Sequence, residues 1–523
     1  MKRKLSLLAI AIFVALLPIM VLRDYTPSNE LRYLSIADEA IEQGNIFAFT
    51  NQGAAYADKP PVYFWYVMLG KVLFGEHLMW FLSLLSIVPA LVILWVMSRW
   101  TAPWLDERTR ISGALMTMCS GLFLGLAVVL RMDMLMCMFI TLALYAFWQE
   151  YSSEGNSSKP LWLFPLYTFL ALFTKGPVGV LVPILSALLF CAIKRRWQTM
   201  GRIFGWRFWL VLLSGCGVWF GAVYIDGGAD YLNNLLFHQT IDRAVDAFHH
   251  KEPWYYYLIS VWYSVAPFSL LAVGVVLLHW ACRKPMSDIE QLFSVIIAST
   301  FVMLSVFSSK LAVYLAPTFP FIIFLALLFM QGERVKRWHR IAVTLPAAIF
   351  ALAPVAALVA PHVAELPIRL SVTLWAAIIL LGAGGLGTIL LVWRRESLHA
   401  ATDALSATLL AAAFVGGMAL PQLNPEMGYG ALCREAMRMA ESHEAEEFFT
   451  WNIRRPENMD VYLGRDIVQV STAEILSGRC NGSVVMLSKR HLASETELRE
   501  ALDSLPATDT GGYRTIYIPT TSE

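Results

Sequence analysis

Short segments of this sequence place acidic and basic side chains at the ends of long apolar runs. An ionisable group at such a position is costly unless it is paired or binds a ligand. Several cations gathered together bind an anion, and a carboxylate among them can accept a proton. The segments are RDYTPSNELRY (23–33), YADKPP (56–61), VLRMDM (129–134), FTKGPVG (173–179), HHKEPW (249–254) and SSKLAVYLAP (308–317).

A plainer interpretation exists for each of these residues taken singly. A lone lysine or arginine at the end of a membrane helix usually extends its head group to the lipid head groups. His249 and His250 are more often interface residues than metal ligands, so a divalent metal ion is the less favoured alternative, and the sequence indicates no other cofactor. Together, however, the cations and acids favour an anion site.

Composition defines the class of protein. Hydrophobic residues make up 57% of the 523 positions and charged residues only 15%, which is typical of a polytopic membrane protein. A formal net charge of +1 argues against a nucleic-acid partner. The chain also lacks a P-loop, a GxSxG elbow, an HExxH helix and a CxxC pair, which excludes common soluble catalytic designs.

Apolar runs predict an all-α fold with about thirteen membrane-spanning helices. The first run could be a signal peptide, but no small-residue cleavage site follows it, so a retained span is favoured. The runs begin near residues 5, 78, 112, 132, 162, 177, 207, 257, 290, 311, 338, 369 and 405.

The distribution of lysine and arginine predicts the orientation. With a cytoplasmic N-terminus, the basic loops around residues 99–110, 194–202, 283–284, 334–340 and 394–395 all lie inside. The charged segments described above and the C-terminal region then share the outer face. Interfacial structure is expected in the outer segments 23–77 and 226–256, including a helix that ends at Gly44.

Composition changes after Pro421, where charge rises. We predict a membrane domain over residues 1–420 and a small soluble α/β domain over 421–523. EFFTWNI, SVVML and RTIYIP are its expected strands, between helical stretches around 426–447 and 493–505. Cys433 and Cys480 both lie in this domain and are candidates for a disulfide in an oxidising compartment.

In this order, NELRY, DKPPVYFW, the R-x-D at 131–133, TKGPVG, HHKEPWYYY and SKLAVYLAP resemble the membrane glycosyltransferases that use polyprenyl-phosphate sugars. The group resembled is the aminoarabinose transferases of lipid A, with their relatives the protein O-mannosyltransferases. The resemblance covers about residues 1–330 by motif and reaches 420 by span count; the tail matches no part of these families. It implies a C-type glycosyltransferase fold in the bacterial inner membrane, with the active site and C-terminal domain on the periplasmic face.

The resemblance implies an inverting enzyme that moves a sugar from undecaprenyl monophosphate to an acceptor hydroxyl. Consecutive prolines restrict the backbone beside Lys59 and present it to the donor phosphate at the lipid boundary. Arg32 stands where the family has another phosphate-contacting arginine. The further expected phosphate contacts are Arg131, Lys251, Lys175 and Lys310, and the expected pocket residues are Asn29, Asp58, Tyr314 and His250.

One departure concerns the general base. The family usually has Asp-Glu where this chain has Asn29-Glu30, and an asparagine cannot take the proton of the acceptor hydroxyl. Glu30 is the first candidate for that role, followed by Asp133 and Asp24. Little base assistance and an inactive homologue are the alternatives.

Other functions remain open at this stage. A transporter is also polytopic, although transporters tend to have repeated halves and polar groups near the membrane midplane. A flippase or ligase for undecaprenyl-linked glycans is a second alternative. The acceptor is equally open between lipid A, a surface glycan and an exported protein.

Overall fold

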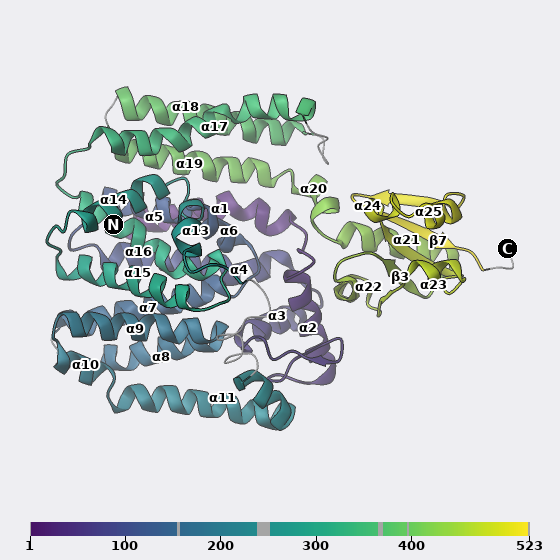
Figure 1. Ribbon diagram of the computed structural model, residues 1–523, viewed down its shortest axis with the longest axis horizontal. Coiled ribbons are helices and arrows are strands. Elements are labelled where there is room, and N and C mark those ends of the chain that lie inside the picture. The colour runs from purple at the N-terminus through teal and green to yellow at the C-terminus, as the bar shows by residue number, and fades with distance from the viewer. Residues whose placement is uncertain (1, 154–156, 238–250, 364–369, 395–396, 521–523) are drawn as a thin grey trace.

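A computed structural model describes residues 2–153, 157–237, 251–363, 370–394 and 397–520, which form a bundle of long helices with a small sheet at one end (Figure 1). We call the end of the bundle beside α2 (Glu30–Gln43), α3 (Val62–Phe74) and the sheet the domain end. The helices of the bundle are α1 (Lys2–Leu22), α4 (Met79–Trp100), α5 (Glu107–Met118), α6 (Gly121–Val128), α7 (Asp133–Ser153), α8 (Lys159–Lys175), α9 (Pro177–Ile193), α10 (Trp197–Ile203), α11 (Trp206–Asn233), α13 (Tyr256–Ser264), α14 (Ser269–Ala281), α15 (Asp288–Val306), η2 (Ala312–Thr318), α16 (Phe319–Met330), α17 (Arg337–Val363), α18 (Val372–Arg394) and α19 (Leu398–Gly417).

The helices lie where the apolar runs predicted them, and the chain is an integral membrane protein. Nine helices of the described chain are long and apolar enough to cross a membrane, or ten if the bent pair α5 and α6 is one span. This is fewer than the predicted count of about thirteen. The difference arises because α8 and α9 have only 17 residues each, and because a break after Ser264 separates α13 from α14.

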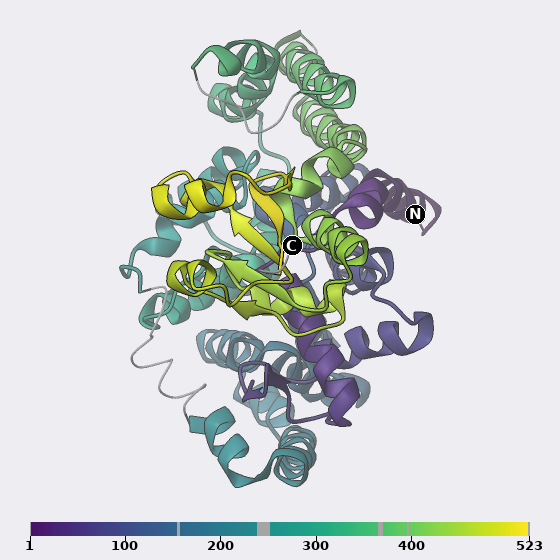
Figure 2. The ribbon, with the colours of Figure 1, turned by 90° about the vertical axis from the view of Figure 1, so that its right-hand side faces the viewer.

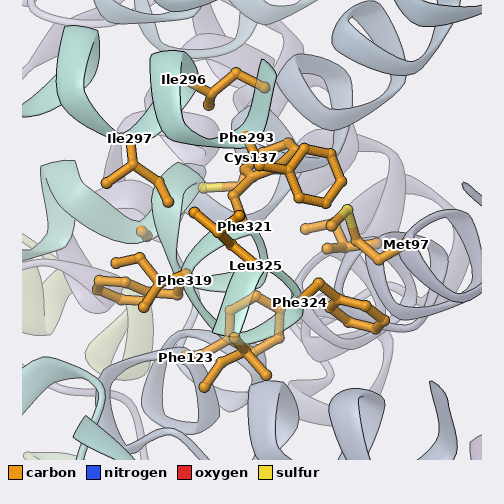
Figure 3. Packing of buried hydrophobic residues seen from close by; sticks show 14 of the residues in the cluster. Met97, Phe123, Cys137, Phe293, Ile296, Ile297, Phe319, Phe321, Phe324 and Leu325 are labelled. Carbon is orange, nitrogen blue, oxygen red and sulfur yellow. The ribbon is translucent and has the colours of Figure 1, made fainter. Parts of the chain in front are cut away.

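The core of the bundle is built around α16. Its sequence FPFIIFLALLFM is apolar on every side, and a helix of that kind must be surrounded by others. Phe321, Phe324 and Leu325 are 0% exposed. Figure 3 shows them packed with Phe293 and Ile296 of α15. This core fixes the helix ends from which the charged residues project.

Helices α17 and α18 form a layer at the side of the bundle together with α19 (Figure 1). Many of their apolar side chains are exposed, including Ile349 at 69% and Leu352 at 61%. Contact of such an apolar surface with lipid is favourable, whereas its contact with water is unfavourable. The layer therefore agrees with a chain that spans the bilayer.

The first connecting segment forms α2 (Glu30–Gln43), the hairpin β1 (Thr50–Asn51) and β2 (Ala54–Ala55), and α3 (Val62–Phe74). Helix α2 ends at Gly44, whose φ of 74° is the left-handed conformation that glycine adopts most easily, as the sequence predicted. In the second predicted segment, 226–256, α11 continues to Asn233. Residues 238–250 of that segment lie outside the described residues.

After the bundle, α20 (Leu420–Met427) connects to a five-stranded mixed sheet of order β4-β3-β5-β7-β6. The predicted strands and helices of this region are present, together with two further strands. Figure 2 shows the sheet in front of the bundle with α2 beside it. Its elements are α21 (Gly430–His443), β3 (Phe448–Trp451), η3 (Pro456–Met459), α22 (Asp460–Leu463), β4 (Val468–Gln469), α23 (Thr472–Leu476), β5 (Ser483–Ser488), α24 (Lys489–Leu492), α25 (Thr496–Leu502), β6 (Ala507–Thr510) and β7 (Tyr513–Ile518).

The candidate disulfide is wrong, because Cys433 and Cys480 are both free thiols. Cys433 packs in a cluster with Val484 and Met486 of β5, whereas Cys480 packs in a cluster with Val485 of the same strand. Successive side chains of a strand point to opposite faces, so the sheet separates the two thiols.

Candidate active site

Asp133 is a buried carboxylate held between two cations. It is the first residue of α7, and its side chain is 1% exposed. Arg131 Nε donates a hydrogen bond of 3.0 Å to Asp133 Oδ2, and Lys175 Nζ donates one to Oδ1. Two cations around one acid leave a net positive charge at this point, which suits an anionic ligand.

The segment TKGPVG is a tight turn between two packed helices that presents Lys175. Gly176 has a φ of 100°, which favours glycine, and Pro177 opens α9 without losing a helical hydrogen bond. A Cβ on Gly179 would lie 2.3 Å from the carbonyl carbon of Ala171, so only glycine permits this approach of α9 to α8. Lys175, the last residue of α8, is thereby fixed beside Asp133.

Tyr314 completes this side of the cluster. It lies in η2, a short 3-10 helix of the segment SKLAVYLAP. Lys175 Nζ is 4.8 Å from the centroid of the Tyr314 ring, within the range of a cation–π contact. The predicted pocket residue Tyr314 and the predicted cation Lys175 thus lie together.

Helix α2 brings a third cation to the same place. The phenol of Tyr33 has Arg131, Asp133, Arg32 and Asp58 as its electrostatic neighbours, and burial raises its pKa. Tyr33 therefore stays a neutral hydroxyl between the charged groups. Arg131, which comes from a distant part of the sequence, and Arg32, the residue before Tyr33, are both near enough to influence the charge of this side chain.

Arg32 stacks on an aromatic ring, and one of its nitrogens has no partner in the part of the chain that the structure describes. Its guanidinium carbon is 5.5 Å from the centroid of the Tyr56 ring. Its Nε is buried and has no hydrogen-bond partner among the described residues. A buried donor without a partner is costly, so this nitrogen is ready to bind an acceptor supplied by a ligand.

The loop that carries Lys59 is held by the end of α11. Asp226 Oδ2 accepts hydrogen bonds from three successive backbone amides, those of residues 46–48, at 2.7 to 3.1 Å. Tyr231 donates to the carbonyl oxygen of Tyr56 at 2.7 Å. Asp58 and Lys59 follow in the partly buried stretch before α3.

The geometry argues against Glu30 as the general base. Glu30 is 0% exposed, and its carboxylate receives two hydrogen bonds from Arg23, at 2.5 and 2.7 Å. It also accepts from the backbone amides of Thr26 at 2.8 Å and Leu130 at 2.7 Å. These donors belong to the fold itself, and they leave neither oxygen of Glu30 facing the cation cluster; Glu30 instead ties the start of α2 to the R-x-D segment.

Asp24 is likewise occupied elsewhere. Its Oδ1 accepts hydrogen bonds from the Tyr462 hydroxyl and from the Tyr25 amide, and its Oδ2 accepts one from the Gly430 amide at 2.9 Å. These contacts connect the first segment to the C-terminal region. Of the three predicted bases, Asp133 alone lies among the cations.

Of the remaining predicted residues, Lys310 is turned into the protein. Lys310 is 4% exposed and donates to the carbonyl oxygens of Glu252 and Phe307 at 2.9 and 2.6 Å, which argues against contact with a donor phosphate. Lys251 is exposed and pairs through its backbone with Ser309. Asn29 precedes α2 without capping it by its side chain. His249 and His250 lie outside the described residues.

Sequence reasoning missed Tyr33, Asp226 and Tyr231. Tyr33 belongs to the quoted motif NELRY, and its spacing one residue after Arg32 was the available signal. Asp226 and Tyr231 lie in a predicted outer segment, but nothing local shows that their partners are residues 46–56.

Comparison with known proteins gives relatives by sequence and by structure, although no family model matches the chain. It is 26% identical over 333 residues to undecaprenyl phosphate-alpha-4-amino-4-deoxy-L-arabinose arabinosyl transferase 1 of Pseudomonas fluorescens Pf0-1, covering 62% of this chain and 56% of the relative. It is 27% identical over 292 residues to the corresponding Pseudomonas aeruginosa PAO1 transferase, covering 55% of this chain and 52% of the relative. The matches thus span about half of the length of these relatives.

The likeness in structure extends over nearly the whole chain. The crystal structure of ArnT from Cupriavidus metallidurans bound to undecaprenyl phosphate has a TM-score of 0.76 at 17% identity, covering 97% of this chain and 96% of ArnT. The apo structure has a TM-score of 0.74 at 18% identity, covering 98% of each chain. The chain therefore has the fold of these ArnT structures, the C-type glycosyltransferase fold that the sequence motifs implied.

Proposed function

We propose that this chain is a membrane glycosyltransferase that moves a sugar from undecaprenyl monophosphate to an acceptor hydroxyl. The observation that carries the proposal is the gathering of Arg32, Arg131 and Lys175 around Tyr33 and Asp133, with the buried Arg32 Nε unpartnered among the described residues. A binding site for a phosphate in a lipid environment needs this kind of arrangement. The named relatives are arabinosyl transferases, which supports the same reaction class.

The charges of these side chains indicate how the transfer would proceed. The acceptor oxygen attacks the anomeric carbon of the sugar from the face opposite the phosphate, and the bond between that carbon and the phosphate oxygen breaks. The electron pair leaves with undecaprenyl phosphate, whose added negative charge Arg32, Arg131 and Lys175 stabilise. The hydroxyl proton goes to a carboxylate, for which Asp133 is the best-placed candidate of the three predicted.

The donor is a membrane lipid, and the basic loops indicate how the chain is oriented in the membrane. The polyprenyl tail lies along the apolar helices near the domain end. The basic loop after α9 lies at the opposite end of the bundle (Figure 1), and basic loops favour the cytoplasm. We therefore place the cluster and the sheet domain on the periplasmic face of the bacterial inner membrane. Lipid A, a surface glycan and an exported protein are the candidate acceptors.

The proposal is tested with the full-length protein in lipid nanodiscs. The measurement is the release of undecaprenyl phosphate from undecaprenyl-phosphate sugars, including aminoarabinose, in the presence of lipid A. Arg32→Ala should lower kcat/KM by about a hundredfold or more, because it removes a donor aimed at the leaving phosphate. Arg438→Ala is the matched control, since this arginine is exposed in α21 of the sheet domain.

Two results would contradict the proposal. One is the absence of release with every donor and acceptor pair when the wild-type protein is folded. The other is equal activity of Arg32→Ala and wild type. Movement of the intact donor across the membrane without release of undecaprenyl phosphate would instead support the flippase alternative.

A further inference from the structure

The sheet domain packs directly on the segment that carries Arg32. Leu31, Leu34 and Ala37 of α2 share one hydrophobic cluster with Leu432 and Met459 of the C-terminal region. Helix α2 contacts both η3 and α22, and Figure 2 shows α2 beside the sheet. The side chains of α2 are thus buried partly by the bundle and partly by a domain that lies far away in the sequence. The hydrogen bond between Asp24 and Asn424, which are 400 residues apart, joins the same two parts of the chain.

Asp460, the first residue of α22, joins two parts of the first segment. Its Oδ2 accepts a hydrogen bond of 2.7 Å from the Ser35 hydroxyl of α2. The same oxygen accepts one of 3.0 Å from the Gln52 side-chain amide, in the turn of the β1–β2 hairpin. Gln52 Nε2 also donates to the carbonyl oxygen of Glu457 at 3.3 Å, which strengthens the same connection.

Each of these two parts leads to a predicted phosphate-binding cation. Ser35 follows Arg32 by three residues, so the two are neighbours on the surface of α2. The hairpin leads into Tyr56, whose ring carries the Arg32 guanidinium, and then to Lys59. One carboxylate oxygen therefore fixes the distance between the two segments.

A second contact fixes the start of α2. Asp24 accepts hydrogen bonds from Tyr462 and Gly430, and the rings of Tyr25 and Tyr462 are 6.3 Å apart. A Cβ on Gly430 would lie 2.8 Å from Asp24 Oδ2, so a larger residue here would have to displace the Asp24 carboxylate. The sheet domain thus holds α2 near both its first turn and its middle.

We propose that Asp460 is a positioning residue through which the sheet domain sets α2 and the β1–β2 hairpin in register for binding of the donor phosphate. This inference rests on the proposed function. Asp460 itself does not touch the donor; it acts through Arg32 and Lys59. The sheet domain is then a part of the donor site instead of an independent module.

The first test measures the binding of undecaprenyl phosphate to the full-length protein. Asp460→Ala should weaken binding by about three- to tenfold, the effect expected for the loss of hydrogen bonds to a charged acceptor. Asp460→Asn retains an acceptor oxygen and should largely restore binding. Asp466→Ala, which removes an exposed carboxylate of the same domain, is the matched control.

A double-mutant cycle separates positioning from general stability. Ser35→Ala combined with Asp460→Ala should weaken binding no further than Asp460→Ala alone, because both remove the same contact. Fully additive losses, or a loss that follows the unfolded fraction of each variant, would overturn the inference. So would wild-type affinity in Asp460→Ala.

The second test needs no ligand and therefore separates this inference from the proposed function. Amide hydrogen exchange of α2 and of residues 50–55 should become faster in Asp460→Ala and not in Asp466→Ala. Unchanged exchange in both segments would refute positioning even if the wild-type protein binds no undecaprenyl phosphate. A lack of binding by wild type with faster exchange in Asp460→Ala would contradict the proposed function and leave the positioning of these segments supported.

Discussion

At the residue scale, neighbouring carboxylates have different tasks because of what surrounds them. Glu30 is enclosed by donors, and Arg23 matches it with two parallel hydrogen bonds. Asp133 is also paired with cations, but those cations belong to the candidate donor site. The two acids should therefore respond differently to the same substitution.

We predict that Glu30→Gln lowers stability, whereas Asp133→Asn lowers catalysis. Glu30→Gln leaves the buried Arg23 without its counter-charge, which should cost about 3–5 kcal/mol, while the protein that remains folded keeps its specific activity. Asp133→Asn should lower the specific activity of folded protein by about a hundredfold or more. Thermal melting together with activity per folded molecule measures both effects.

The reverse pattern would reassign the base. If Glu30→Gln melts like wild type but is inactive, then Glu30 takes the proton in spite of its donors. Retained activity in Asp133→Asn would remove Asp133 from the role.

Local sequence could indicate that Arg131 and Asp133 act together, because only Met132 separates them along the chain. It could not reveal the task of Glu30. The Leu130 amide that contacts Glu30 lies 100 residues away in sequence, and a carboxylate in NELRY has the same local appearance whether it is free or enclosed. Tyr33 was overlooked for the same reason, since its neighbours Arg131 and Asp133 come from another helix end.

At the element scale, the turn between α8 and α9 shows how a glycine fixes a functional side chain. Gly179→Ala should disrupt the packing of these helices, because the new Cβ would lie 2.3 Å from the Ala171 carbonyl carbon. We expect a loss of stability of several kcal/mol, as in an overpacked core, and a loss of activity through displacement of Lys175. Thermal melting and the release assay measure the two effects.

Gly217 of α11 provides the matched control. A Cβ at this position would meet nothing within 4 Å, and alanine is the better helix former. Gly217→Ala should therefore leave stability and activity close to wild type. Equal behaviour of the two alanine variants would contradict the role given to Gly179.

Most helices could be predicted from the length of the apolar runs, because a helix that crosses a bilayer must have a defined length. The end of α2 at Gly44 followed from residue type, as did the main strands of the sheet. The β1–β2 hairpin was not predicted. Its strands have only two residues each, so no alternation of apolar and polar residues flanks the turn at Gln52 and Gly53. Breaks such as that between α13 and α14 were also hidden within a continuous apolar composition.

At the scale of the whole molecule, the sequence predicted a bundle and a sheet domain but not how they meet. Asp24 contacts Tyr462, which lies 438 residues later, and no local pattern records such a pair. A domain at this place can either dock an acceptor or support the enzyme. Its contacts with α2 favour support, exerted at the segment that carries Arg32.

This junction should also make the molecule sensitive to pH. Burial raises the pKa of Asp460 from 3.8 to about 6, and the nearby negative charge of Asp38 adds to the shift, although hydrogen bonds from Ser35 and Gln52 oppose it. The native state therefore binds a proton more tightly than the unfolded state does. The stabilisation is complete below about pH 4, the unfolded pKa of an aspartate, and is lost as the pH rises through about 6.

We predict that the wild-type protein melts at a lower temperature at pH 7 than at pH 5, with a difference in stability of about 1.4 kcal/mol, because about one unit of this pKa shift acts between these two pH values. Asp460→Asn, which carries no charge at either pH, should lose most of this difference. Asp466→Asn, an exposed carboxylate of the same domain, should retain it. Asp38, which pairs with His77 and Lys71, is present in all three proteins. If Asp460→Asn keeps the full pH dependence, the sensitivity belongs to another group and the junction is not its source.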